Sequence, residues 1–217
     1  MPTVYVTGGA QGAQQINTLV AEVLPWMLSH ADVIHQCGPT ALEALRGHAE
    51  TLPPALRQRY LVTGYVGAEL PDVLALADVV ISRSGAGTIA EITALGKASV
   101  FIPLASSAGN EQAHNALHLQ DTGAAIGLTG SPTPQDLQAA VAPLLGDPAR
   151  RAAMAGHARA HGRPDAAVKL VDVVLSAVGE QRLRERSESM SRCGKPLACH
   201  KFAPRPCIRP AFHAEGR

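Results

Sequence analysis

Short apolar runs alternate with segments of helical periodicity along the first 180 residues, and this alternation constrains the fold more than any other feature. The apolar runs predict six strands, over residues 4–7, 33–37, 60–66, 78–82, 99–102 and 124–128. Helices are predicted between and after them, over residues 14–28, 40–48, 71–76, 88–95, 110–121, 134–145, 148–160 and 165–178. This alternation predicts an α/β fold with a doubly wound, Rossmann-like parallel sheet.

Two glycine-rich loops follow predicted strands, at the edge where parallel sheets bind their ligands. The first runs from Gly8 to Gly12, and the second spans residues 82–87 and leads into a helix whose first turn we place at Thr88. Loop amides and the positive end of a helix dipole favour phosphate. We therefore expect an anion site at this edge, with glycines that serve only a tight turn as the alternative.

Two common nucleotide sites do not fit the first loop. A Walker-A loop ends in Gly-Lys-Ser/Thr, whereas Gly12 is followed by Ala13 and Gln14. A dinucleotide site places an acidic residue at the end of the second strand, but Asp32 stands at its beginning. The pattern therefore disfavours NAD.

Glu91 has two interpretations. It lies three residues after Thr88, the spacing of a capping box in which its carboxylate would bind the Thr88 amide. A carboxylate beside a phosphate site could instead accept two hydrogen bonds from a ribose diol. Arg83 in the same loop would either brace the loop or form a salt bridge with Glu91.

Composition excludes several classes of partner. A net charge of +1 and an aromatic content of 3% predict no binding to nucleic acid. The sequence has no apolar run of 18 residues and no signal peptide at its N-terminus, so we expect a cytoplasmic protein. With 217 residues, of which 46% are hydrophobic, the chain can bury one α/β core and carry a tail.

The last segment, residues 181–217, differs from the domain predicted over residues 1–180. It holds nine Lys and Arg against three Asp and Glu, and four prolines, so we expect a disordered basic tail. The alternatives are a tether to anionic lipid, translation past a frameshift, or a zinc site formed by Cys193, Cys199, His200 and Cys207. The spacing of these four residues fits no familiar zinc pattern.

Other candidate catalytic or metal-binding groups are weaker. His114 with His118, and His157 with His161, have helical i,i+4 spacing but no third ligand, so we expect histidines on helix surfaces. Ser84 lacks the preceding glycine of a hydrolase nucleophile elbow.

Three motifs in order carry a resemblance to a known family. They are Gly8-Gly9-x-Gln11-Gly12-Ala13 with Asn17, Arg83-Ser84-Gly85-Ala86-x-Thr88-x-x-Glu91, and Gln112-x-x-Asn115-Ala116 followed by Leu119. Over residues 4–178 the sequence resembles the C-terminal domain of the MurG-like UDP-GlcNAc glycosyltransferases of family 28, which have the GT-B fold. The resemblance implies one half of a GT-B enzyme that transfers GlcNAc from UDP-GlcNAc to a lipid-linked acceptor (lipid I to lipid II, in peptidoglycan synthesis). It also implies inverting chemistry with no cofactor and no metal, at the inner face of the cell membrane.

The resemblance also implies a set of residues that bind UDP-GlcNAc. Glu91 would bind the ribose hydroxyls, the Val66 backbone the uracil edge, and Gln112 a GlcNAc hydroxyl. The two glycine-rich loops would contact the diphosphate, and residues 86–88 the GlcNAc as well. The full set is Gly9, Ala10, Gln11, Gly12, Val66, Ala86, Gly87, Thr88, Glu91, Gln112 and Asn115.

Departures from the family pattern bear on this interpretation. Ala10 stands where the family usually has a serine that would reach the diphosphate, and the acidic Glu111 precedes Gln112. The family's N-terminal half, which holds the acceptor loops and the proposed base, has no counterpart here, so the catalytic residues are expected outside this chain. We expect a truncated gene, a misassigned start or a two-chain enzyme with a separate N-terminal partner. The alternatives are a non-catalytic or remnant UDP-sugar-binding subunit and a non-hydrolysing UDP-GlcNAc epimerase.

Overall fold

The computed structural model describes the backbone of residues 1–192 and the side chains of residues 1–179. The chain divides into a compact unit, Met1–Ala166, and a second unit that begins at Ala167. The compact unit contains the sheet and all the residues predicted to bind the donor.

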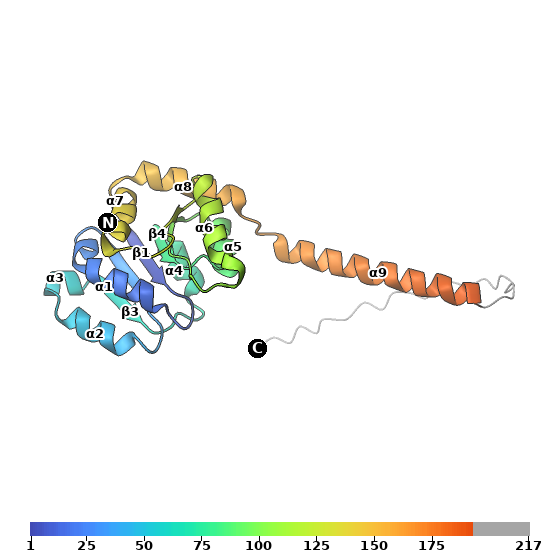
Figure 1. Cartoon of the computed structure of the whole chain (residues 1–217), viewed down its shortest axis with the longest axis horizontal. Coiled ribbons are helices and arrows are strands. Elements are labelled where there is room, and N and C mark those ends of the chain that lie inside the picture. The colour runs from blue at the N-terminus through green and yellow to red at the C-terminus, as the bar shows by residue number, and fades with distance from the viewer. Residues whose placement is uncertain (193–217) are drawn as a thin grey trace, which may run out of the picture. The chain divides into compact units, whose positions relative to one another are not determined.

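A six-stranded parallel sheet forms the centre of the compact unit (Figure 1). Its strands are β1 (Thr3–Thr7), β2 (Asp32–Gln36), β3 (Tyr60–Thr63), β4 (Val79–Ser82), β5 (Ala98–Phe101) and β6 (Ile126–Gly127). They lie in the order β3-β2-β1-β4-β5-β6, and every neighbouring pair is parallel. The strand order reverses beside β1, which makes the β1/β4 boundary the switch point where such sheets bind ligands. The predicted doubly wound α/β fold is confirmed.

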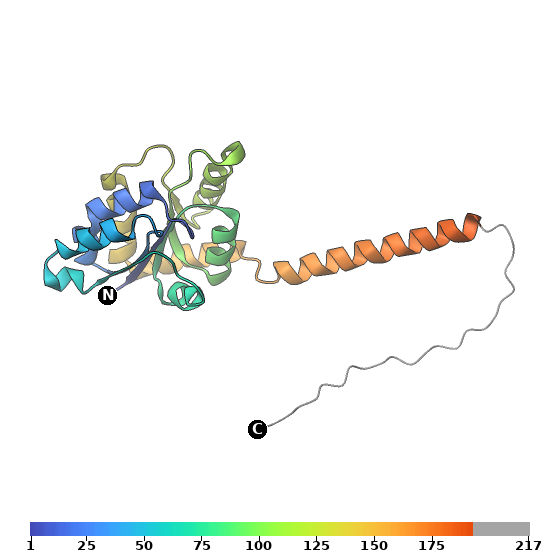
Figure 2. The same cartoon turned by 90° about the horizontal axis from the view of Figure 1, so that it is seen from below.

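Helices cover both faces of the sheet (Figures 1 and 2). The helices of the compact unit are α1 (Gln14–Leu28), α2 (Leu42–Glu50), α3 (Pro54–Arg57), α4 (Leu70–Leu76), α5 (Ala86–Leu95), α6 (Glu111–Asp121), α7 (Pro134–Gly146) and α8 (Pro148–His161), with a 3-10 turn η1 at Ala108–Asn110. Helix α9 (Ala166–Arg192) belongs, from Ala167 on, to the second unit. On one face, Val4 and Val6 of β1 pack with the apolar sides of α1 and α7. On the other face, Tyr5 packs with residues of α4, α5 and α6. The alternation of side chains along β1 thus builds two cores from a single strand.

Several predicted ends are shifted by one or two residues, and β6 covers only Ile126–Gly127 of the predicted residues 124–128. Four other differences are more consequential. β3 ends at Thr63, before Gly64, and not at residue 66. The short helix α3 was not predicted; Pro54 occupies its first position, where the fixed φ of proline suits a helix. Helix α5 begins at Ala86, two residues before Thr88.

The fourth difference lies at the end of the described chain. Helix α9 continues to Arg192, so residues 181–192 are helical where an irregular tail was expected. The cysteines and histidine considered as zinc ligands lie outside the described residues. Among residues 1–192, no helix has the length and apolar character needed to cross a membrane.

Candidate functional site

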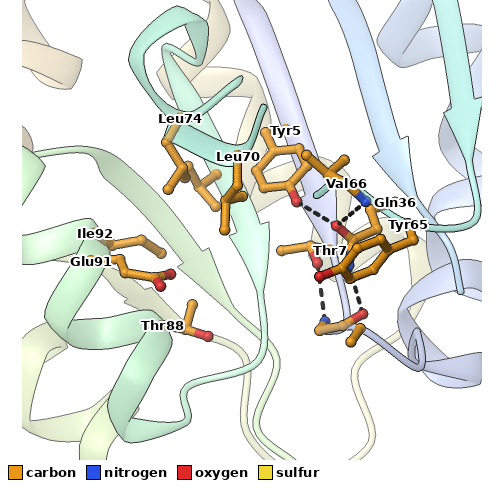
Figure 3. Close-up of a pocket in the computed structure, with 13 residues that line it drawn as sticks. Tyr5, Thr7, Gln36, Tyr65, Val66, Leu70, Leu74, Thr88, Glu91 and Ile92 are labelled. Carbon is orange, nitrogen blue, oxygen red and sulfur yellow. Dashed lines mark hydrogen bonds between the residues drawn. The ribbon is translucent and has the colours of Figure 1, made fainter. Parts of the chain in front are cut away.

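A cavity of about 190 Å³ opens at the carboxyl edge of the sheet, beside the switch point (Figure 3). Residues from β1, β2 and β4, from the loops after β1 and β3, and from α4 and α5 line it: Tyr5, Thr7, Gly9, Ala10, Gln36, Tyr65, Val66, Leu70, Leu74, Val80, Thr88, Glu91 and Ile92. Five of the predicted donor-binding residues are among them, namely Gly9, Ala10, Val66, Thr88 and Glu91. The cavity therefore brings together residues from Tyr5 to Ile92, up to 87 positions apart in the sequence.

The loop after β1 is closed by its own hydrogen bonds. The Gly9 amide donates to Thr7 Oγ1 at 3.0 Å, and the Gly9 carbonyl accepts from the Gly12 amide at 2.9 Å. Gly12 has a φ of +75°, and a Cβ atom there would overlap the Cys37 carbonyl oxygen. The glycine is therefore required both by conformation and by contact with the next loop. The Ala10 and Gln11 amides make no hydrogen bond within the described part of the chain and remain free for a ligand.

The N-terminus of α5 is open. Gly85 is its N-cap, and no side chain caps the helix. Ala86, Gly87 and Thr88 occupy the first three helical positions, where amides have no intrahelical acceptor. These three amides and the positive end of the helix dipole are the groups that the predicted anion site requires.

The capping-box interpretation of Glu91 is wrong. Because α5 begins at Ala86, Glu91 falls in the second turn, and no hydrogen bond joins it to Thr88. Its carboxylate is exposed and makes no hydrogen bond or salt bridge with any described residue. Burial raises the pKa of the Tyr5 hydroxyl, with the negative charge of Glu91 as a smaller contribution, so that charge acts across the cavity.

Arg83 braces the loop and does not pair with Glu91. Its half-buried guanidinium donates to Gln15 Oε1 at 2.9 Å and to the carbonyl oxygens of Ile102 and Pro103 at 2.8 and 2.9 Å. Burial lowers its pKa. Arg83 therefore joins the second glycine-rich loop to the start of α1 and to the segment after β5.

Gln112 and Asn115 lie at the first turns of α6, outside the cavity lining. Gln112 Oε1 accepts from the Leu104 amide at 3.0 Å, which leaves its NH₂ group beside Gly85. Asn115 Nδ2 donates to Ser84 O and to Glu111 Oε1, both at 3.1 Å, so its carboxamide oxygen is the group left for a substrate. Gln112 is thus the one of the two that keeps a free amide donor.

Sequence reasoning missed a buried polar cluster beneath the first loop. His35 binds Tyr60 Oη at 2.8 Å and Asn17 Oδ1 at 3.1 Å, and Asn17 Nδ2 donates to Cys37 O at 2.9 Å. Burial lowers the pKa of His35 to about 4, which keeps the imidazole neutral at neutral pH. These bonds join residues 18 to 25 apart in the sequence, so no local pattern marks them.

The four histidines of the two i,i+4 pairs lie on helix surfaces, as expected: His114, His118 and His157 are exposed and His161 is partly exposed. The His118 ring contacts the His161 ring, with centroids 5.3 Å apart, and not the His114 ring. Among the described side chains, those of residues 1–179, no three His, Cys, Asp or Glu lie close enough together to hold a metal ion.

Residues 3–170 match the glycosyltransferase family 28 C-terminal domain. The chain belongs to glycosyltransferase family 28. The predicted resemblance is therefore confirmed.

Relatives of this family 28 domain carry one name, UDP-N-acetylglucosamine–N-acetylmuramyl-(pentapeptide) pyrophosphoryl-undecaprenol N-acetylglucosamine transferase. The protein from Xanthomonas axonopodis pv. citri (strain 306) is 38% identical over 178 residues, which cover 81% of this chain and 41% of the relative. The protein from Listeria monocytogenes serovar 1/2a is 37% identical over 177 residues, which cover 81% of this chain and 48% of the relative. The chain thus spans less than half the length of these two relatives.

Solved structures agree with this assignment. The crystal structure of Acinetobacter baumannii MurG superposes with a TM-score of 0.68 at 27% identity, covering 81% of this chain and 52% of that one. A putative UDP-N-acetylglucosamine 2-epimerase from Listeria monocytogenes superposes with a TM-score of 0.58 at 16% identity, covering 82% of this chain and 46% of that one. The likeness to the epimerase shows the fold alone.

Proposed function

We propose that this family 28 domain binds UDP-GlcNAc as the donor half of a MurG-like transferase, which moves GlcNAc to a lipid-linked acceptor. One observation carries the proposal. The unpartnered Glu91 carboxylate lies in a cavity bordered by the uncapped start of α5 and the loop after β1 (Figure 3). The names of the relatives from Xanthomonas and Listeria support UDP-GlcNAc as the donor.

Each part of the donor meets suitable chemistry at this edge of the sheet. Glu91 accepts two hydrogen bonds from the ribose diol. The amides of residues 86–88 and of Ala10 and Gln11 face the diphosphate, and the free NH₂ of Gln112 binds a GlcNAc hydroxyl. In this arrangement Gly9 and Gly12 shape the loop, since their amides are already bonded within it.

The chemistry proposed for the bound donor is electrostatic. An acceptor hydroxyl attacks the anomeric carbon, the bond from that carbon to the UDP oxygen breaks, and the electron pair leaves with UDP. The helix dipole of α5 and the loop amides stabilise the negative charge that grows on the diphosphate. Removing one such donor costs roughly 2.7 to 4 kcal/mol in comparable enzyme sites.

The other half of the reaction needs groups that this part of the chain does not hold. We propose that an N-terminal domain or partner chain binds the lipid-linked acceptor and supplies the base, at the inner face of the cell membrane. Its absence in the cell would leave a UDP-sugar-binding subunit without transferase activity.

The direct test is calorimetric titration of the chain with UDP-GlcNAc, UDP-GalNAc and UDP. Glu91→Ala should weaken UDP-GlcNAc binding about 30-fold or more, because two hydrogen bonds to a charged acceptor are lost. Glu22→Ala is the matched control, since Glu22 is an exposed carboxylate on α1 that does not line the cavity. Equal affinities for the wild-type chain and Glu91→Ala would remove Glu91 from the site.

A further inference from the structure

Gln36 occupies an unusual position for a polar residue. It is the last residue of β2, paired in register with Thr7 of β1 and Thr63 of β3, and only 4% of its surface is exposed. Its side chain lies at the carboxyl edge of the sheet and lines the cavity (Figure 3). A buried carboxamide here must be hydrogen-bonded by the protein or by a ligand.

The carboxamide of Gln36 connects three separate segments. Its Oε1 accepts from Tyr5 Oη at 3.0 Å and from the Val66 amide at 3.1 Å, and its Nε2 donates to the Gly9 carbonyl at 2.8 Å. Only one orientation of the carboxamide works, because the Val66 amide must donate and the Gly9 carbonyl must accept. Both acceptor positions of Oε1 are therefore filled, and one hydrogen on Nε2 remains.

The two ends of this side chain serve different parts of the proposed donor site. Gly9 belongs to the loop whose next two amides face the diphosphate. Val66 belongs to the loop after β3, expected to meet the uracil. While Gln36 holds the Val66 amide, only the Val66 carbonyl is left to contact a base.

We propose that Gln36 is a positioning residue of the donor cavity, which fixes the spacing between the Gly9 loop and the Val66 loop. The inference rests on the proposed function, since it names what holds the two loops of that site. Gln36 holds the Gly9 carbonyl and the Val66 amide in place. The loops that carry these two groups, and not Gln36 itself, contact the donor.

The test compares two glutamines that each bind a backbone amide. Gln36→Met removes all three bonds at similar volume. Gln120→Met is the matched control, because Gln120 Oε1 accepts from the Gly127 amide at 2.9 Å, and Gln120 does not line the cavity. We expect Gln36→Met to weaken UDP binding at least about tenfold, the effect of an unpaired buried polar group, and Gln120→Met to leave it unchanged. Equal UDP affinities for Gln36→Met and wild type would overturn the inference.

The variant Gln36→Glu tests the hydrogen bond to the Gly9 carbonyl, because lowering the pH should restore that bond. An ionised carboxylate keeps two acceptors but faces the Gly9 carbonyl, whereas a protonated carboxyl donates to it as the glutamine does. Burial raises the pKa of a carboxyl at this position above its ordinary value, so UDP affinity relative to wild type should be low at about pH 8.5 and should recover at about pH 5.5. Dividing the UDP affinity of the variant by that of wild type at each pH removes effects of Tyr5, Tyr65 and Glu91, the other titratable groups of the cavity lining. A ratio that does not change with pH contradicts the role of the Gly9 bond.

Amide hydrogen exchange of the ligand-free chain separates this inference from the proposed function. The Val66 amide should be protected in wild type and in Gln36→Glu, and should exchange faster in Gln36→Met. If wild type binds no UDP ligand but Val66 responds as expected, the proposed function fails and the positioning role stands. Val66 protection that is the same in all three proteins overturns the positioning role, whatever the binding result.

Discussion

The two glycine-rich loops look alike in sequence but are built in opposite ways. In the first loop, the Gly9 carbonyl accepts two hydrogen bonds, and Gly12 packs against the Cys37 carbonyl. In the second, the amides that begin α5 have no side-chain cap, and the loop's own Arg83 and Ser84 side chains bind Gln15 and the Gln112 carbonyl. The first loop therefore depends on its glycines for its shape, and the second depends on side chains of its own that bind distant segments. Substitutions in the two loops should have different effects.

The largest difference is expected from alanine at a glycine of each loop. Gly12→Ala should lower the free energy of unfolding by about 4 kcal/mol, because positive φ and a backbone overlap add. Gly87→Ala should change it by less than about 1 kcal/mol, since a Cβ there meets no atom within 4 Å and Gly87 lies in a helix. Urea denaturation of both variants measures this. Similar losses in the two would remove the contrast between the loops.

The free energy of unfolding should also depend on pH through His35. This histidine binds Asn17, which binds the Cys37 carbonyl against which Gly12 of the first loop packs. The folded-state pKa of His35 is lowered to about 4 by burial, below its ordinary value, so the unfolded chain takes up the proton first as pH falls. The His35 contribution is complete above about pH 6.5 and is lost as pH falls to 4, a loss of about 3 kcal/mol. Urea denaturation across this range measures it.

A histidine control isolates the effect. His35→Leu should remove this part of the pH dependence, whereas His114→Ala, at an exposed position on α6, should keep it. An unchanged pH slope in His35→Leu would mean that other groups cause the acid sensitivity.

A smaller effect is expected where the second loop is anchored. Ser84 Oγ is buried and donates to the Gln112 carbonyl at 2.7 Å, so Ser84→Ala should cost about 1 to 2 kcal/mol. Ser99 in β5 is equally buried, but its Oγ has no partner among the described residues, so Ser99→Ala should be neutral or stabilising. Thermal unfolding of both variants tests the pair. A larger loss from Ser99→Ala than from Ser84→Ala would contradict the anchoring role.

The sequence predicted the features that repeat and missed those that connect distant residues. The alternation of apolar runs and helices correctly predicted six parallel strands, and the glycine-rich loops predicted the edge of the sheet where the cavity opens. Thr88 lies in the first turn of α5, as predicted, but the helix begins at Ala86, and its N-cap is Gly85, with extended backbone and no side-chain hydrogen bond. The bonds of Gln36 and His35 span 18 to 31 residues, so the sequence around each residue does not identify its partners. The polar ending of the apolar run at 33–37 was the one available signal.

The smallest predicted effect concerns Ala10, in the first loop. Its amide is free and lines the cavity, but the methyl side chain offers no hydroxyl. Ala10→Ser should strengthen UDP binding by about 0.5 to 1 kcal/mol, up to about fivefold, because one hydrogen bond to the diphosphate is added at an exposed position. Calorimetry with UDP and with uridine locates the gain, since uridine has no phosphate. A gain of the same size for uridine would mean that the new hydroxyl acts on the loop and not on the diphosphate.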